Sequence, residues 1–154
     1  MERLVHRARL EWDGSTGEGY RAYPRAHSAT APPAQASLRL SADPHFRGDA
    51  DLLNPEQLVV LAASSCQLLS FLSVAARKHV DVLRYADDAT GHLSEDLRGA
   101  RIELIELNPV VHVAAGTDEE LVLRLVDQAH DECYIANSLN STVTVRATVV
   151  GGRP

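Results

Sequence analysis

The stretch NPEQLVVLAASSCQLLSFLSVAARKHV, residues 54–80, decides how this sequence folds. Asn54 is a good N-cap, Pro55 suits the first helical position, and Gln57 can close a capping box with Asn54. Apolar residues then recur at helical spacing as far as Ala76. Basic residues at 77–79 complement the helix dipole in the last turn. The pattern predicts one long, mostly apolar helix with Cys66 near its middle.

The same stretch bears on where the protein works. Its apolar run, residues 58–76, is interrupted by serines, Cys66 and Gln67, which favours a buried core helix over a membrane span. The first twelve residues are charged and alternating, and they lack the apolar region of a signal peptide. Two cysteines are too few for a disulfide-stapled secreted scaffold. We therefore expect a cytoplasmic protein with reactive or free thiols.

Composition limits the classes of partner. The chain has 154 residues, 45% hydrophobic and 23% charged, which predicts a single globular domain over residues 1–154. A formal net charge of -6 does not favour binding to nucleic acid or to an anionic membrane. We expect neither partner.

Other segments predict strands and shorter helices. Period-two alternation or β-branched composition predicts strands at residues 5–12, 20–27, 35–41, 82–93, 101–113 and 141–150, with a turn at 94–100. Thr117 is the expected cap of a second helix with an acidic first turn, and residues 133–140 can form a short helix. Strands therefore cluster in antiparallel runs, so we predict an α+β fold with antiparallel sheets packed on a long central helix.

The two cysteines admit two readings. A lone cysteine on an apolar helix is usually a small buried hydrophobe, and this applies to Cys66 and Cys133 alike. Three features favour a reactive Cys66. Small residues precede it, Glu56 is one of few charges on its helix, and Arg25 and Arg47 are isolated arginines upstream. An arginine held by a glutamate near a thiol favours the reactive thiolate.

These motifs resemble those of the OsmC and organic hydroperoxide resistance (Ohr) family. The resemblance rests on NPEQLVVLAASSC at 54–66, SADPHFRGD at 41–49, CYIANSLN at 133–140 and the order of elements, and it spans almost the whole chain. YRAYPRAH at 20–27 points to the OsmC-like branch. The resemblance implies an intertwined homodimer with its sites at the subunit interface.

The resemblance also implies a chemistry and a set of roles. The activity would be a thiol-dependent peroxidase, a cysteine-based hydroperoxide reductase that needs no metal and no organic cofactor. Cys66 would attack the organic hydroperoxide and Cys133 would resolve the sulfenic acid to a disulfide, which an external dithiol reduces. Glu56 matches the family's arginine-binding carboxylate. Arg25 is the first choice for the activating arginine and Arg47 the second.

The sequence departs from the family pattern at two positions and leaves two rival functions open. Tyr134 follows the second cysteine where many relatives have proline, and Gln67 follows the first where relatives often have histidine or an apolar residue. One rival is a non-catalytic small-molecule binder on the same fold, and the other is a cysteine redox sensor. Histidines are scattered without chelating spacing, so we expect no metal site. The chain also lacks a Rossmann pattern and a GxSxG elbow.

Overall fold

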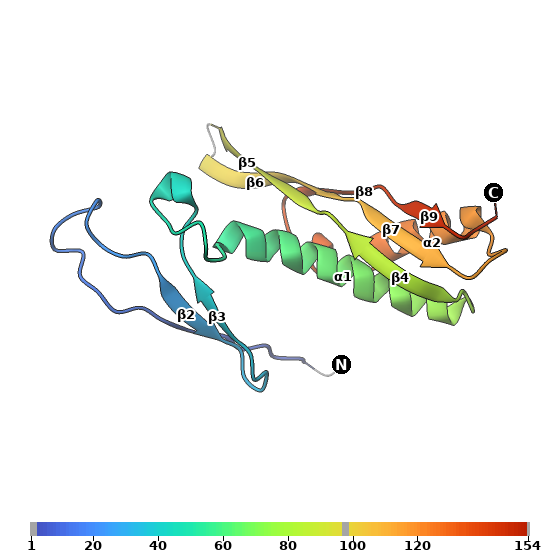
Figure 1. The fold of residues 1–154 in the computed structure, drawn as a ribbon, viewed down its shortest axis with the longest axis horizontal. Helices are drawn as coiled ribbons and strands as arrows, with labels where there is room; N and C mark the ends of the chain where they lie inside the picture. The colour runs from blue at the N-terminus through green and yellow to red at the C-terminus, as the bar shows by residue number, and fades with distance from the viewer. Residues whose placement is uncertain (1–2, 97–98, 154) are drawn as a thin grey trace. The chain divides into compact units, whose positions relative to one another are not determined.

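The computed structural model describes residues 3–96 and 99–153, which fall into two compact units, Met1–Leu58 and Val59–Pro154 (Figure 1). Each unit is described by itself below. The long helix α1, Pro55–Arg77, begins in the first unit and continues into the second.

The first unit is built on a small antiparallel sheet. Its strands are β1 (Arg9–Glu11), β2 (His27–Thr30) and β3 (Ser37–Leu40), in the order β1-β2-β3. All of β1 is exposed, and Leu40 is the buried apolar residue of β3. A short 3-10 helix, η1 (Pro44–Phe46), follows before α1. This sheet confirms the predicted strands at 5–12 and 35–41, although both are shorter than predicted.

The predicted strand at 20–27 is wrong, because β2 begins at His27. The Arg25 guanidinium donates hydrogen bonds to the carbonyl oxygens of Tyr20 and Tyr23. A side chain that binds the backbone of its own segment holds that segment in turns, which leaves it unavailable for a strand ladder. The sequence of the segment alternates, but its local hydrogen bonds prevail.

Helix α1 begins where the capping pattern predicts. The Gln57 N–H donates to Asn54 Oδ1 at 2.8 Å, and the Asn54 N–H donates to Gln57 Oε1 at 3.0 Å, so the capping box is confirmed. The helix ends at Arg77, where His79 takes a left-handed conformation (φ 57) and the Val80 N–H donates to the Ala75 carbonyl at 3.0 Å. The predicted last turn at 77–79 therefore extends two residues too far.

Within the described ranges, α1 is also the helix that is long and apolar enough to cross a membrane by length and composition. A core helix of a soluble protein passes the same test. The buried residues of α1 recur at helical spacing along one face, and they are Ala63, Gln67, Phe71, Val74 and Ala75.

The second unit contains two three-stranded sheets. One has the order β4-β7-β9, with β4 Val82–Asp87, β7 Pro109–Val113 and β9 Thr148–Val150. The other has the order β5-β6-β8, with β5 Thr90–Asp96, β6 Gly99–Leu107 and β8 Thr142–Val145. Both sheets are mixed, because β6–β8 and β7–β9 pair in parallel. The predicted antiparallel sheets are therefore confirmed only in part, because β4–β7 and β5–β6 pair antiparallel, while the α+β class is correct.

Each of three predicted strands is split between the two sheets. The strand predicted at 82–93 is β4 and β5, that at 101–113 is β6 and β7, and that at 141–150 is β8 and β9. Asp87 fixes the first two breaks together, because its Oδ1 accepts the Asn108 N–H at 2.7 Å. At the third break, the Arg146 N–H donates to the Leu107 carbonyl at 2.8 Å. The predicted turn at 94–100 includes residues 97 and 98, which lie outside the described residues.

Helix α2, Glu119–Asp131, follows β7. Its N-cap is Asp118, whose Oδ1 accepts the N–H groups of Glu120 (3.0 Å) and Leu121 (3.3 Å). Thr117, the predicted cap, instead donates its hydroxyl to the Ala114 carbonyl at 2.6 Å. A short 3-10 helix, η2 (Ala136–Ser138), confirms the expectation for residues 133–140.

The core of the second unit consists of two apolar clusters. One joins α1, β7 and α2 through Phe71, Val74, Ala75, Val111, Val113, Val122, Leu125, Val126 and Ala129. The other joins α1 to β6 through Ala63, Ile105 and Leu107. The first cluster packs α1 against α2, and so it joins the helix that carries Cys66 to the helix that precedes Cys133.

Candidate functional site

Cys66 lies in the middle of α1 and is half-buried. Ala63, one turn before it, is fully buried against Ile105 and Leu107. Gln67, directly after it, is also fully buried, and its Nε2 donates to the Val126 carbonyl of α2 at 3.1 Å. Cys66 is therefore on a well-packed helix, while the residue itself is only partly buried.

Cys133 lies in the turn between α2 and η2 and is buried, with 1% of its surface exposed. Its N–H donates to the His130 carbonyl at 3.2 Å, and its own carbonyl accepts the Asn137 N–H at 3.0 Å. Its sulfur accepts the Ala136 N–H at 3.4 Å. The backbone around Cys133 is thus ordered by local hydrogen bonds.

The fold brings the two cysteines together. Both are free thiols, and they lie close enough for Cys66 to affect the ionisation of Cys133. Burial, followed by the neighbouring Cys66 thiol, raises the pKa of the Cys133 thiol to about 11. Cys133 therefore keeps its proton at neutral pH.

Glu56 lies in the first turn of α1, directly after Pro55. Its Oε2 is buried and has no hydrogen-bond partner in the described part of the chain. A buried carboxylate oxygen without a partner is costly unless a donor or a cation satisfies it. The local structure of the first unit leaves this oxygen available for such a donor.

Arg25 lies in an aromatic cage, which we define as Trp12, Tyr20 and Tyr23. Its guanidinium carbon is 3.8 Å from the Tyr23 ring centroid and 4.8 Å from that of Tyr20. Trp12 packs edge-on against Tyr23 and donates its indole N–H to the Pro24 carbonyl at 2.8 Å. The cage fixes a half-buried cation within the first unit.

Arg47 follows η1 and adopts a left-handed backbone conformation (φ 65). Its side chain is exposed. Between the described residues, no ion pair joins Arg25 or Arg47 to Glu56. The structure thus brings Cys66 and Cys133 together in the second unit, and it leaves the three charged candidates without mutual contacts.

The sequence interpretation missed two polar groups around the cysteines. Ser64 donates its hydroxyl to Asp87 Oδ2 at 2.5 Å, which ties α1 to the break between β4 and β5. Arg77 binds Glu132, the residue before Cys133. Both contacts join residues distant in sequence. The acidic residue directly preceding Cys133 was the local signal that could have pointed to the second.

Metal binding has no geometric support in the described ranges. They contain no group of three or more histidine, cysteine, aspartate or glutamate side chains placed to hold an ion.

The model of the family described as OsmC-like protein matches residues 48–148. The chain belongs to the OsmC-like family. The match includes both cysteines, Glu56, the whole of α1 and all strands after it except the end of β9. No curated protein matches the sequence.

Solved structures agree with this assignment. An OsmC-like protein of unknown function from Vibrio cholerae is 28% identical, with a TM-score of 0.84, covering 96% of this chain and 100% of that chain. An organic hydroperoxide resistance protein from Elizabethkingia anophelis is 19% identical, with a TM-score of 0.71 and coverage of 98% and 99%. The organic hydroperoxide resistance protein OsmC of Legionella pneumophila is 18% identical, with a TM-score of 0.69 and coverage of 97% and 98%. The last two show a shared fold.

Proposed function

We propose that this OsmC-like protein is a thiol-dependent peroxidase that reduces organic hydroperoxides through Cys66 and Cys133. The observation that carries the proposal is the closeness of the two free thiols, because a peroxidatic cysteine needs a resolving thiol within reach. The names of the Elizabethkingia and Legionella neighbours, which refer to organic hydroperoxide resistance, agree with this substrate class.

The proposed reaction has two steps. The Cys66 thiolate attacks the O–O bond of the hydroperoxide, becomes a sulfenic acid and releases an alkoxide, which takes up a proton to leave as an alcohol. The Cys133 thiol then displaces water from the sulfenic sulfur and forms the disulfide. An external dithiol of the cytoplasm returns both thiols to the reduced state.

The roles of the two cysteines follow from their surroundings. Cys66 is half-buried and so can meet a substrate, whereas Cys133 is buried and holds its proton. The half-buried thiol is suited to attack, and the buried thiol is suited to resolution. This arrangement supports Cys66 as the peroxidatic residue.

The proposal also assigns an arginine to the reaction. A guanidinium beside Cys66 stabilises both the thiolate and the leaving alkoxide. Arg25 is the first candidate because the cage holds its guanidinium in a fixed orientation, and Arg47 is the second. The buried, unpartnered Oε2 of Glu56 is suited to accept a hydrogen bond from that guanidinium.

We further propose that the protein, taken as one OsmC-like domain over residues 1–154, works as an intertwined homodimer. Leu61, Leu69 and Leu72 of α1 are 58%, 63% and 40% exposed and follow one another at helical spacing. A second copy of the chain would remove this apolar stripe from water. Light scattering would then give twice the chain mass of 16.7 kDa.

Intact-mass analysis of the reduced protein after one equivalent of cumene hydroperoxide tests the reaction. We expect the wild type to lose two hydrogens, Cys133→Ser to gain one oxygen as a trapped sulfenic acid, and Cys66→Ser to keep its mass. Unchanged mass in the wild type, with both thiols still free, would reject the peroxidase and favour a binding role.

A further inference from the structure

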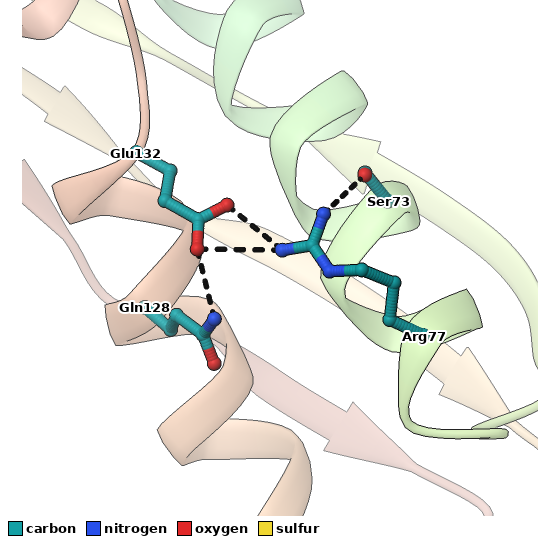
Figure 2. A network of polar contacts seen from close by, with 4 residues as sticks. All are labelled: Ser73, Arg77, Gln128 and Glu132. Carbon is teal, nitrogen blue, oxygen red and sulfur yellow. Dashed lines mark hydrogen bonds and ion pairs between the residues drawn. The ribbon is translucent and has the colours of Figure 1, made fainter.

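Four polar residues tie the end of α2 to the end of α1 (Figure 2). Arg77 Nη2 contacts both carboxylate oxygens of Glu132, at 2.9 and 3.3 Å, and Arg77 Nη1 donates to Ser73 Oγ at 2.8 Å. Gln128 Nε2 donates to Glu132 Oε1 at 2.8 Å. We call this set, Ser73, Arg77, Gln128 and Glu132, the clamp.

The clamp is attached directly to a cysteine of the proposed site. Glu132 is the C-cap of α2 and precedes Cys133 in the chain. The other side of the turn is held by Asn137, whose Nδ2 donates to the Asp131 carbonyl at 2.9 Å. Arg77 is on α1, the helix that carries Cys66. The clamp therefore links the two elements that present the two thiols.

A glutamate is an unusual choice at this place. A negative charge near the C-terminus of a helix opposes the helix dipole. Hydrogen bonds from Gln128 and then Arg77 nevertheless hold the pKa of Glu132 below its usual range, so the carboxylate stays charged. The local pairing outweighs the unfavourable dipole.

The clamp is not a buried stabilising element. The side chains of Arg77 and Glu132 are 54% and 43% exposed. Exposed ion pairs contribute little to the free energy of unfolding. The apolar cluster of Phe71, Val122 and Val126 already packs α1 against α2. The clamp can therefore position the Cys133 turn without being needed for folding.

We propose that Arg77 and Glu132 are positioning residues for the resolving step, holding the Cys133 turn where its thiol can reach the oxidised Cys66. This inference rests on the proposed function. In the step concerned, the Cys133 sulfur attacks the Cys66 sulfenic sulfur and the S–S bond forms as the S–O bond breaks. The hydroxyl leaves with the Cys133 proton as water, so atoms and electrons balance.

Disulfide geometry explains why the placement matters. The bond forms only over a narrow range of Cα separations and dihedral angles. A turn that is free to move by about 1 Å can slow a geometrically strict step on the order of 100-fold. Cys66 needs no such help for the first step, because it lies inside a packed helix.

The test compares Arg77→Met and Glu132→Ala with the control Arg124→Met. Arg124 is also an exposed arginine, 63% exposed. It pairs with Glu120 on α2 at 3.8 Å, so its removal costs an arginine and a longer, more exposed ion pair away from the turn. The first measurement is the effective concentration of the Cys66–Cys133 disulfide in glutathione redox buffers, which needs no peroxide. The second is the rate of each step after cumene hydroperoxide.

We expect both clamp variants to lower the effective concentration and the rate of disulfide formation on the order of tenfold. The rate of sulfenic acid formation, the Tm and the Arg124→Met control should stay at wild-type values. The double variant Arg77→Glu with Glu132→Arg should recover most of the loss, because it restores the pair. Wild-type effective concentrations in both clamp variants would overturn the proposal, as would an equal fall in the control.

These outcomes also distinguish a failure of the positioning proposal from a failure of the proposed peroxidase function. A wild type that ignores hydroperoxide, with a lower effective concentration in the clamp variants alone, would reject the proposed function and keep the positioning role. A wild type that reduces hydroperoxide while all variants resolve at the same rate would keep the function and reject the clamp.

Discussion

The two units of the chain hold their polar and reactive groups in different ways. In Val59–Pro154, Cys66 and Cys133 are placed by packed helices, and two apolar clusters surround those helices. In Met1–Leu58, Leu40 is the described apolar residue that is buried, and Arg25 is held by the carbonyls and rings of its own loop. The thiol pair therefore depends on the core, whereas the arginine depends on a local cage.

The two units also differ in how their elements are covered. In the second unit, buried apolar clusters pack against the helix that carries Cys66 and the helix that precedes Cys133. The first unit has a small, largely exposed sheet, and such sheets need a covering surface to be stable. The proposed homodimer would supply such a surface.

The largest expected effect is on stability, and it tests whether the second unit has an apolar core that the first unit lacks. Phe71→Ala should lower the free energy of unfolding by about 3–5 kcal/mol, because a fully buried aromatic ring is removed. Leu10→Ala in β1 should cost less than about 0.5 kcal/mol, because Leu10 is 62% exposed. Urea unfolding at low protein concentration measures both. Equal losses would show that the first unit has a core of its own.

The second effect is on catalysis, and it tests the arginine. Arg25→Gln should lower kcat/KM for cumene hydroperoxide on the order of 100-fold, because the proposed mechanism uses this cation to stabilise the developing oxyanion. The exposed Arg21 in the same loop is the matched control, and Arg21→Gln should leave kcat/KM unchanged. Arg47→Gln completes the series. A large loss in Arg47→Gln with none in Arg25→Gln would reverse the choice of arginine.

The parts of the fold that local chemistry determines could be predicted from sequence. The start of α1 follows from Asn54, Pro55 and Gln57, which are neighbours and satisfy one another. The breaks between β4 and β5 and between β6 and β7 could not be seen, because they depend on a bond between Asp87 and Asn108. Each predicted strand is continuous in composition, so only the long-range contact shows where it changes sheets.

The candidate site shows the same limit. A reactive Cys66 could be inferred from its helix and from the family resemblance, but spacing alone could not place Cys133 beside it. The segment at 20–27 was predicted as a strand, and the structure instead has a cage there that holds Arg25. The roles of Arg25, Arg47 and Glu56 remain predictions.

A smaller effect is expected on assembly, and it tests whether the exposed stripe of α1 is a subunit contact. Leu69→Glu should raise the dimer Kd roughly tenfold or more, because a charge would be buried in an apolar interface. Leu83→Glu on β4 is the matched control, since Leu83 is 65% exposed and lies outside the stripe. Light scattering over a dilution series measures both. A wild type that is monomeric at every concentration would contradict the prediction.

The smallest effect is a pH dependence confined to the second unit. The folded state raises the pKa of Cys133 to about 11 from its usual 9.0, so folding favours the protonated thiol. The resulting stability is fully present below pH 9 and is lost as the pH rises from 9 towards 11. Tyr85 also lowers the stability of the folded state above pH 10, because burial and then the Asp87 charge raise its pKa. Urea unfolding of the reduced protein between pH 8 and 10 isolates the cysteine, and Cys133→Ser should flatten the curve there. A wild-type curve that is equally flat would mean that the thiol is no harder to ionise in the folded state, and the raised pKa of Cys133 would be rejected.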